Sequence, residues 1–309
     1  MKVLIVHSGT QNKTSAYIKE QVDSLISLGL EINYFTITKK GVKGYLSHLP
    51  KLYKKINEFK PDIIHAHYGI SGLFANLQRK IPVITSFHGS DVYKSKNVVL
   101  SKIAYYLSKE TIFVSSKLKT KFGVKRGNII TCGVDMNLFK PASPLFERES
   151  IILFSGSADN KVKNYPLANE GVKIFNNHFV KCDLHFRLTE LKNKSRKEVV
   201  HLMNTAQLLL ITSIYEGSSQ VLKEAMACNC PVVTTNVGSV RDLISKESKA
   251  GIIVEPFPES IANGIHKVLS EDFKHGRKEL VEYEIGLGQV AQRILMLYNK
   301  VASNSTNRS

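Results

Sequence analysis

Short apolar segments alternate with helical segments along this chain, and the alternation runs through both halves of the sequence. The first half begins with an apolar segment at residues 2–7, and the second half begins with one at 151–154. Strands that are apolar nearly throughout, with a helix between each pair, are typical of parallel sheets covered by helices on both faces. The sequence therefore predicts an α/β protein with two Rossmann-like, doubly wound domains.

The expected domain boundaries follow from the length of the chain and from two prolines. The chain has 309 residues, which is more than one hydrophobic core usually supports. Pro141 and Pro144 interrupt the alternating pattern and mark the expected join. The predicted parts are an N-terminal domain at 1–143, a C-terminal domain at 144–286, a helix at 287–301 that packs back on the first domain, and a disordered tail at 302–309.

Basic residues are in clear excess. Lys and Arg outnumber Asp and Glu by 43 to 26, which gives a formal net charge of +17. Such an excess favours an anionic partner, such as nucleic acid, an anionic membrane surface or an anionic substrate. The chain has no zinc-finger spacing, aromatic RNA-binding pair or basic heptad region, so no nucleic-acid partner is expected. No apolar run is long enough to span a bilayer and no signal peptide is evident, so a cytoplasmic location is expected.

One segment is a candidate for contact with the inner face of an anionic membrane. Residues 45–60 place apolar side chains on one helical stripe, and Lys51, Lys54 and Lys55 flank that stripe. Each lysine near an anionic surface favours binding by about 1 kcal/mol, so a peripheral location is predicted. The alternative is that the stripe packs on the sheet and leaves the lysines in water.

Ligands of open α/β sheets bind beyond the carboxyl ends of the strands, so the residues there form the candidate site. In the first half, Gly9 follows the first strand and lets the backbone approach a phosphate. The segments 65–69 and 88–91 follow two later strands and bring three histidines and an aspartate. A cleft lined by histidines for hydrogen bonding or proton transfer is favoured, and a metal site is the alternative. His65 is interpreted as a core residue, and it is expected on the opposite face of its strand from His67.

In the second half, Lys163 follows the first strand in a turn of small residues, where its ammonium group suits a phosphate. Glu216 precedes a Gly-Ser-Ser turn that can open a helix, and free N–H groups at a helix start favour an anion. Glu224 lies eight residues further on, inside that helix. Carboxylates accept hydrogen bonds from sugar hydroxyls, so a sugar beside a phosphate is indicated. Cys228 and Cys230 do not have the spacing of a zinc or redox site and are expected to be structural.

The segment from Glu216 to Glu224, with its seven intervening residues and the following Ala-Met-Ala-Cys, resembles the retaining glycosyltransferases of family 4. Further segments fall in the order of that family, namely Gly9, 65–67, 88–91 and 133–135 with Phe139 and Pro141. The resemblance implies the GT-B fold, in which two Rossmann-like domains face each other across a cleft. The N-terminal domain is then expected to bind the acceptor, and the C-terminal domain the nucleotide sugar.

The resemblance also implies a role for each matching residue. Glu216 would lie over the donor sugar near its anomeric carbon, and Glu224 would hold the ribose hydroxyls. Lys163 would neutralise the diphosphate, and His88 would face the reacting sugar and the acceptor. The other implied residues are Gly9, Thr10, Gly217 and Ser218 for the nucleotide sugar, and His67, Tyr68 and Asp91 on the acceptor side. No cofactor and no metal is expected, because a basic side chain and helix N-termini take the leaving-group charge.

The sequence departs from the family pattern in three respects. Ser157 stands where an Arg usually follows the glycine after the first C-terminal strand, which leaves Lys163 as the main positive charge. Ser218 and Ser219 replace the usual Phe-Gly. The first domain is also short for the family.

These features predict a retaining, metal-independent glycosyltransferase of the hexosyltransferase type. It is expected to move a sugar from a UDP-linked donor to a glycan or lipid-linked acceptor in surface polysaccharide or glycolipid synthesis. A same-fold alternative is a UDP-sugar 2-epimerase or a nucleotide-sugar binder that does not catalyse transfer. An alternative of another class is a basic peripheral membrane or polyanion-binding protein.

Overall fold

The computed structural model describes residues 1–9, 14–39, 41–93, 95–144, 146–181 and 184–306. The chain divides into two compact units. Unit 1 combines residues 1–133 with 287–309, and unit 2 comprises residues 134–286. Each unit is built around a parallel sheet of its own.

In the described part of unit 1 the sheet has six strands in the order β2-β1-β3-β4-β5-β6, and all neighbours are parallel. The strands are β1 (Lys2–Ser8), β2 (Glu31–Ile37), β3 (Ile63–His67), β4 (Val83–Phe87), β5 (Glu110–Phe113) and β6 (Asn128–Ile129). The chain order reverses at β1, so the switch point of this doubly wound sheet lies between β1 and β3. Gly9 and Tyr68 follow the carboxyl ends of these two strands, where ligands of such sheets bind.

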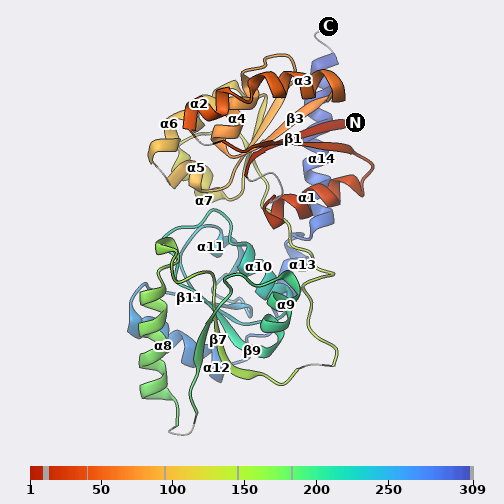
Figure 1. Ribbon diagram of the computed structural model, residues 1–309. Coiled ribbons are helices and arrows are strands. Elements are labelled where there is room, and N and C mark those ends of the chain that lie inside the picture. Colours follow the sequence, from red (N-terminus) through yellow and green to blue (C-terminus); the bar gives the residue numbers. More distant parts are fainter. Residues whose placement is uncertain (10–13, 40, 94, 145, 182–183, 307–309) are drawn as a thin grey trace. The chain divides into compact units, whose positions relative to one another are not determined.

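Helices cover both faces of the unit 1 sheet. They are α1 (Ala16–Ile26), α2 (Gly41–Leu46), α3 (Leu49–Phe59), α4 (Gly69–Asn76), α5 (Ser90–Tyr93), α6 (Ser95–Leu107), α7 (Ser116–Phe122) and α14 (Leu287–Thr306). Alternate strand residues point to opposite faces, so Val3 and Ile5 pack against α1 and α14, whereas Leu4 and Val6 pack against α3 and α4. Figure 1 shows α1 and α14 side by side although they lie at opposite ends of the sequence.

The last helix is longer than the sequence pattern predicts. Residues 302–306 were expected to be a disordered tail, but α14 continues to Thr306. Val301 is still buried at 1% exposure, so the docked helix carries its polar last turn into solvent. Residues 307–309 lie outside the described residues.

The segment proposed for membrane contact packs inward instead. Residues 45–60 form the end of α2 and the whole of α3 rather than one helix. Leu52 and Ile56 are 0% and 5% exposed in the core beneath α3, and Leu49 and Phe59 pack against the same core. The stripe is therefore the sheet-facing side of an ordinary amphipathic helix, and this membrane interpretation of the segment is wrong.

The described part of unit 2 has a five-stranded parallel sheet in the order β11-β10-β9-β7-β8. Its strands are β7 (Glu149–Phe154), β8 (Arg187–Glu190), β9 (Ala206–Ile211), β10 (Val232–Thr235) and β11 (Gly251–Val254). The sequence pattern predicts β8 at 183–187, but the strand begins at Arg187. Asp183 lies outside the described residues.

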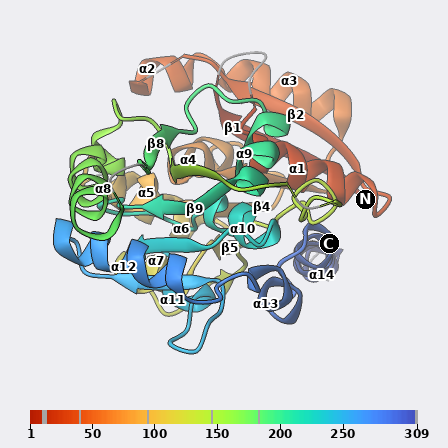
Figure 2. The ribbon, with the colours of Figure 1, turned by 90° about the horizontal axis from the view of Figure 1, so that it is seen from below.

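The helices of unit 2 also form a layer on each face of the sheet. They are α8 (Tyr165–Phe179), α9 (Arg196–Thr205), α10 (Gln220–Ala227), α11 (Val240–Leu243), α12 (Pro258–Ser270) and α13 (Gly276–Glu282), with a short 3₁₀ helix, η1 (Lys161–Lys163). Figure 2 shows α8 and α12 together on one side of the sheet, where they pack on Ile152 and Phe154. Helices α9, α10 and α13 pack on Ile151 and Leu153, which point the other way.

The two units meet along the chain at Gly133 and Val134, upstream of the prolines. The N–H of Val134 donates to the carbonyl of Ile285 at 3.0 Å. The guanidinium of Arg277 donates to the carbonyls of Met136 and Phe139, which ties the following segment to unit 2. Pro141 and Pro144 therefore lie in an irregular segment inside unit 2, downstream of the join that they were expected to mark.

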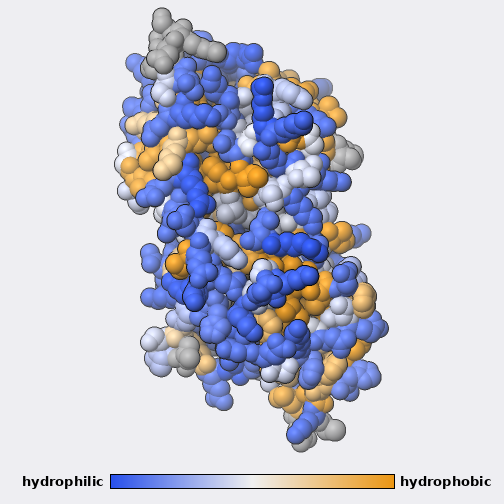
Figure 3. Space-filling model, turned by 180° about the vertical axis from the view of Figure 1, so that it is seen from behind, coloured by the Kyte–Doolittle hydropathy of each residue, from blue (hydrophilic) through white to orange (hydrophobic). Residues whose placement is uncertain are grey.

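The surface matches the charged composition. The face in Figure 3 is mostly hydrophilic, and its hydrophobic residues gather in patches on both units. Among the described residues, no helix combines the length and the apolar character needed to cross a membrane.

Candidate active site

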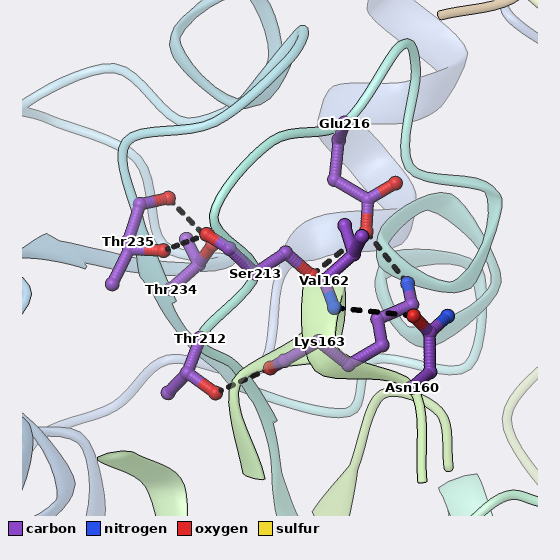
Figure 4. Close-up of polar contacts among 8 residues, drawn as sticks. All are labelled: Asn160, Val162, Lys163, Thr212, Ser213, Glu216, Thr234 and Thr235. Atoms are coloured by element: carbon purple, nitrogen blue, oxygen red, sulfur yellow. Dashed lines mark hydrogen bonds and ion pairs between the residues drawn. The ribbon is translucent and has the colours of Figure 1, made fainter. Parts of the chain in front are cut away.

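A lysine and a glutamate meet at the carboxyl edge of the unit 2 sheet. The Nζ of Lys163 lies 2.6 Å from Oε1 of Glu216, and the hydroxyl of Ser213 donates to the same oxygen at 2.8 Å (Figure 4). The two charged side chains are 19% and 17% exposed. The carboxylate thus stands in a half-buried polar cluster at the start of the loop that leads into α10.

The local sequence explains how Lys163 reaches this position. Asn160 caps η1 by accepting the N–H of Val162 at 3.1 Å, and Lys163 ends that helix. The hydroxyl of Thr212, just after β9, donates to the carbonyl of Lys163 at 3.0 Å. A Cβ on Gly156 would stand 2.9 Å from Cγ of Lys163, so the lysine stem needs a glycine beneath it.

The second glutamate of the motif has a basic partner that sequence reasoning missed. Glu224 lies in α10 with a side chain only 6% exposed, and its Oε1 accepts from Nη1 of Arg196 at 2.6 Å. The guanidinium of Arg196 also stacks over the ring of Phe139 at 4.5 Å. Arg196 is the first residue of α9, whose capping box is formed by Ser195 and Glu198. No spacing in the sequence links Arg196 to Glu224, because only the sheet brings α9 and α10 together.

The segment between the two glutamates holds a buried lysine in α10. Lys223 is fully buried, and its Nζ donates to the hydroxyl of Ser218 at 3.1 Å. Gly217 is buried and Ser218 partly buried beside it. Ser219 precedes α10, but its side chain makes no capping hydrogen bond. Its buried hydroxyl has no partner among the described residues, and neither does the hydroxyl of Ser155 after β7.

Ser157 does not join this cluster. Its hydroxyl lies 3.4 Å from Oδ2 of Asp159, and that carboxylate pairs with Lys192. The position where the family usually has an Arg therefore contributes no cation beside Lys163 in this chain.

Three histidines stack in unit 1. His65 is fully buried between the hydroxyl of Tyr298 at 2.6 Å and that of Ser86 at 2.7 Å, which fits the expected core role. The rings of His65 and His67 stack at 4.5 Å, so the expectation that they face opposite ways is wrong. Residues two apart on a strand share a face. Nδ1 of His67 lies 3.0 Å from Nε2 of His88, and burial lowers the pKa of His67 well below its ordinary value.

Asp91 links the two loops that carry these residues. Its Oδ1 accepts the N–H of Gly69 at 2.9 Å, and its Oδ2 accepts the N–H of His88 at 2.7 Å. Burial raises the pKa of Asp91 to about 6, although the backbone donors act in the opposite direction. Both carboxylate oxygens of Asp91 thus hold backbone N–H groups of the two loops.

Tyr68 is held in a strained conformation next to the histidines. Its φ is 74°, a region that costs a non-glycine residue about 1–3 kcal/mol. The N–H of Tyr68 donates to the carbonyl of Ser86 at 2.8 Å, and its hydroxyl contacts that of Tyr17. The Tyr68 ring lies 4.9 Å from the ring of His88. The strained backbone at Tyr68 therefore accompanies the contact of its ring with His88.

The first glycine of the predicted site is engaged within the sheet. The N–H of Gly9 donates to the carbonyl of Ile37 at 3.1 Å, so it is not available for a phosphate in this structure. Thr10 lies outside the described residues. Gly9 can still allow close backbone approach, because it has no side chain.

Neither the histidines nor the cysteines form a metal site in the part of the chain that the structure describes. No cluster of three or more His, Cys, Asp or Glu side chains with metal-binding geometry occurs there. Cys228 and Cys230 are buried, and burial raises their thiol pKa values to about 12 and about 11. Both thiols therefore stay protonated at neutral pH, as inert packing groups do.

Comparison with known proteins identifies the family. The model of the glycosyl transferases group 1 family matches residues 170–285, and a glycosyl transferase 4-like model matches residues 15–116. The chain belongs to the group 1 glycosyltransferases. Such glycosyltransferases transfer a sugar from a nucleotide sugar. An uncharacterized glycosyltransferase of Methanocaldococcus jannaschii is 28% identical over 269 residues, which cover 76% of each chain.

Solved structures show the fold of this group 1 glycosyltransferase. Sucrose-phosphate synthase from Thermosynechococcus elongatus aligns with a TM-score of 0.77 and 17% identity over 98% of this chain and 99% of that one. Anabaena HepE in complex with UDP aligns with a TM-score of 0.73 and 16% identity over 97% and 100%. HepE has also been solved with UDP-glucose. At these identities the likeness establishes the GT-B fold, which confirms the predicted fold class.

Proposed function

We propose that this glycosyltransferase binds a UDP-linked sugar through unit 2 and transfers the sugar, with retention, to a glycan or lipid-linked acceptor. The observation that carries the proposal is the half-buried pair of Lys163 and Glu216 beside the start of α10. The cation can stabilise the negative charge of the departing diphosphate, and the carboxylate can stabilise the positive charge that develops on the sugar.

Lys163 and α10 suit the diphosphate. An ammonium group has three donors, and those of Lys163 not used by Glu216 have no partner among the described residues. The N-terminus of α10 favours an anion, and the unpartnered hydroxyl of Ser219 at that end can donate to a phosphate oxygen. Backbone groups of Gly217 and Ser218 lie in the same turn. Together these groups supply the leaving-group stabilisation that a metal would otherwise give.

Glu224 suits the ribose. Arg196 occupies its Oε1, and Oε2 accepts no hydrogen bond from the described residues. A carboxylate oxygen in this state can accept from vicinal hydroxyls without first breaking an internal contact. Arg196 fixes the carboxylate in place through this contact. With one oxygen held by Arg196 and the other able to accept, Glu224 suits binding of the nucleoside rather than bond breaking.

Glu216 is the proposed group at the reacting sugar. As the bond to the diphosphate breaks, positive charge develops at the anomeric carbon, and a carboxylate fixed by Lys163 and Ser213 stabilises it. Family 4 enzymes retain the anomeric configuration, and front-face attack requires no covalent nucleophile. The proton of the acceptor hydroxyl then passes to the departing phosphate.

Unit 1 supplies the proposed acceptor side. His67 and His88 stack at 5.2 Å between ring centroids, and Tyr68 lies against His88. Imidazoles and a phenol exchange hydrogen bonds with uncharged hydroxyls, which is the chemistry of a sugar acceptor. Asp91 fixes both loops through their backbone N–H groups.

A screen of nucleotide sugars tests this function. The full chain is incubated with UDP- and GDP-sugars and with glycan or lipid-linked acceptors, and both nucleotide release and the anomeric configuration of the product are measured. We expect release of UDP that depends on an acceptor, with retained configuration. Release of a free 2-epimerised sugar, or binding without any release, would replace transfer by epimerisation or by simple nucleotide-sugar binding.

A further inference from the structure

Helix α6 of unit 1 exposes its apolar side to solvent. Its exposed side carries four apolar residues at helical spacing, Val99, Ile103, Tyr106 and Leu107, which are 66%, 43%, 77% and 36% exposed. Lys102 is the exposed residue between them. A surface helix of a globular protein normally points such a stripe at the core. The exposed stripe on α6 therefore requires an explanation that single exposed apolar residues do not.

The inward side of α6 is small and polar, which explains why the helix is stable in this orientation. Ser101 and Ala104 are fully buried, and a Cβ on Gly69 of α4 would come within 2.2 Å of the Ser101 hydroxyl. The hydroxyl of Ser108, just after the helix, lies 2.7 Å from that of Thr85. Close packing and hydrogen bonds thus hold α6 against α4 and β4. The larger apolar side chains are left outside by this packing.

Basic residues line two surface hollows at the C-terminal end of the exposed stripe. One surface hollow joins Tyr106 to Lys109, Lys125 and Arg126, and a second joins Leu107 to Lys109, Arg79 and Lys80. All five basic residues are exposed, and none forms an ion pair with a described residue. Among the described residues that line the two hollows, Glu110 is the only acid. Lys300 neutralises it at 2.8 Å.

We infer that the exposed side of α6 docks on an anionic lipid bilayer. The apolar stripe enters the boundary between headgroups and acyl chains, and the flanking lysines and arginines bind the anionic headgroups. A second copy of this chain would bring two sets of five positive charges together, which opposes self-association through this face. A soluble polyanion would use the charges but leave the apolar stripe without a partner. The inference does not depend on the proposed transfer reaction.

Vesicle binding by the full chain tests this inference. The probes are vesicles of phosphatidylcholine alone and of phosphatidylcholine with phosphatidylserine, in co-sedimentation at low salt. We expect binding only to the anionic vesicles, and its loss near 1 M salt, where screening acts within about 3 Å. Equal binding to both vesicle types, or to neither, would overturn the inference.

Two double variants separate the apolar and the basic contributions. Ile103→Ser with Tyr106→Ser should weaken vesicle binding at least about tenfold, because the apolar contact area is lost. Lys125→Glu with Arg126→Glu should weaken it at least about a hundredfold, because each basic residue contributes roughly fivefold and each becomes repulsive. All four side chains are exposed or line a surface hollow, so folding should be unaffected, which circular dichroism checks.

Matched controls sit elsewhere on unit 1. Lys51→Glu with Lys54→Glu makes the same charge change on α3, and Ile26→Ser with Met296→Ser removes apolar residues that are 48% and 69% exposed. Both controls should bind anionic vesicles within about twofold to threefold of the unmodified chain. If the charge change on α3 weakens vesicle binding as much as the Lys125 and Arg126 change does, the attraction depends only on the net charge of the protein. If the serine variants of α6 bind as well as the unmodified chain, the contact is polyanionic. If they abolish a dimer seen by sedimentation, the face is a self-association surface.

Discussion

The polar clusters of unit 1 and unit 2 differ in how they handle charge. In unit 2, Lys163 and Arg196 each meet a glutamate at 2.6 Å, so the cluster is built from full charges that compensate one another. In unit 1, His67 and His65 are buried with lowered pKa values, so the cluster is built from neutral imidazoles at pH 7. A diphosphate requires the first arrangement, and uncharged hydroxyls suit the second. We therefore expect changes in unit 2 to affect nucleotide binding and changes in unit 1 to affect transfer alone.

The largest effect should come from the cation of unit 2. Lys163→Ala removes the charge that is proposed to face the diphosphate, and Ser157 offers no substitute. We expect the activation free energy of transfer to rise by about 1.5–3 kcal/mol, which lowers the rate roughly 10- to 150-fold. Additional charge in the transition state would increase this loss. Lys161→Ala, an exposed lysine in the same short helix, is the matched control and should change the rate less than twofold. Equal losses of transfer rate in both variants would show that the net charge of this segment matters, and not the position of Lys163.

Arg196 allows the second charge pair to be tested through stability. Arg196→Met leaves the buried Glu224 carboxylate without its partner, so we expect the free energy of unfolding to drop by about 1–3 kcal/mol. Urea denaturation measures this change. The double variant with Glu224→Gln should recover most of the loss, because the unpaired charge is gone. Failure of the double variant to recover would mean that packing on Phe139, rather than the charge pair, is what Arg196 contributes.

In unit 1, His88→Ala should separate transfer from binding. We expect turnover to fall by roughly tenfold, the size of one ordinary hydrogen bond of about 1–1.5 kcal/mol. UDP affinity should remain within twofold of the unmodified chain, because His88 is not among the unit 2 residues proposed to hold the nucleotide. Isothermal titration with UDP and single-turnover transfer give the two quantities. A loss of UDP affinity equal to the loss of turnover would contradict the division between the units.

The buried histidines should make the protein less stable as pH falls. Burial lowers the pKa of His65 to about 3 and that of His67 in the same direction, so their contribution is present above pH 6.5 and is lost as pH falls toward the folded values. Asp91 acts oppositely, because its pKa is raised to about 6 and its contribution is lost as pH rises through that value. Two histidines outweigh one carboxylate between pH 6.5 and 5.5, where we expect a net loss of about 1 kcal/mol. Hydrogen exchange, corrected for intrinsic rates, should locate the loss in unit 1, and uniform loss in both units would count against this cause.

The smallest expected effect is that of a chelator. If Lys163 and the α10 N-terminus neutralise the diphosphate, incubation with EDTA should leave the rate of transfer unchanged. Loss of activity that one metal ion restores would instead assign a metal to the site and point first to the histidines of unit 1.

Regular features of this molecule could be predicted from sequence, whereas contacts between distant elements could not. The apolar strands and the Glu216 to Glu224 segment are local patterns, and they indicate the fold class and the family. Arg196 has no such pattern, because α9 meets α10 only through the sheet. The burial of Lys223 is equally invisible, since a lysine beside a glutamate is usually solvated.

The two surface helices of unit 1 show the same limit. The apolar stripe of α3 suggests a membrane, but Leu52 and Ile56 face the sheet. The stripe of α6 is no stronger as a pattern, yet Ile103 and Tyr106 face outward because Ser101 and its small neighbours take the inward side. The periodicity reveals an apolar side, but only the packing partners decide whether that side is buried.

The most direct test of the account compares the two glutamates of unit 2. UDP affinity and single-turnover transfer are measured for Glu224→Ala and Glu216→Gln. We predict that Glu224→Ala weakens UDP binding by roughly tenfold or more, since a ribose contact is made equally before and during the reaction. Glu216→Gln should bind UDP nearly normally but transfer far more slowly, because its contact forms at the reacting carbon. Normal binding by Glu224→Ala together with lost binding by Glu216→Gln, or no change in either variant, would contradict the central claim.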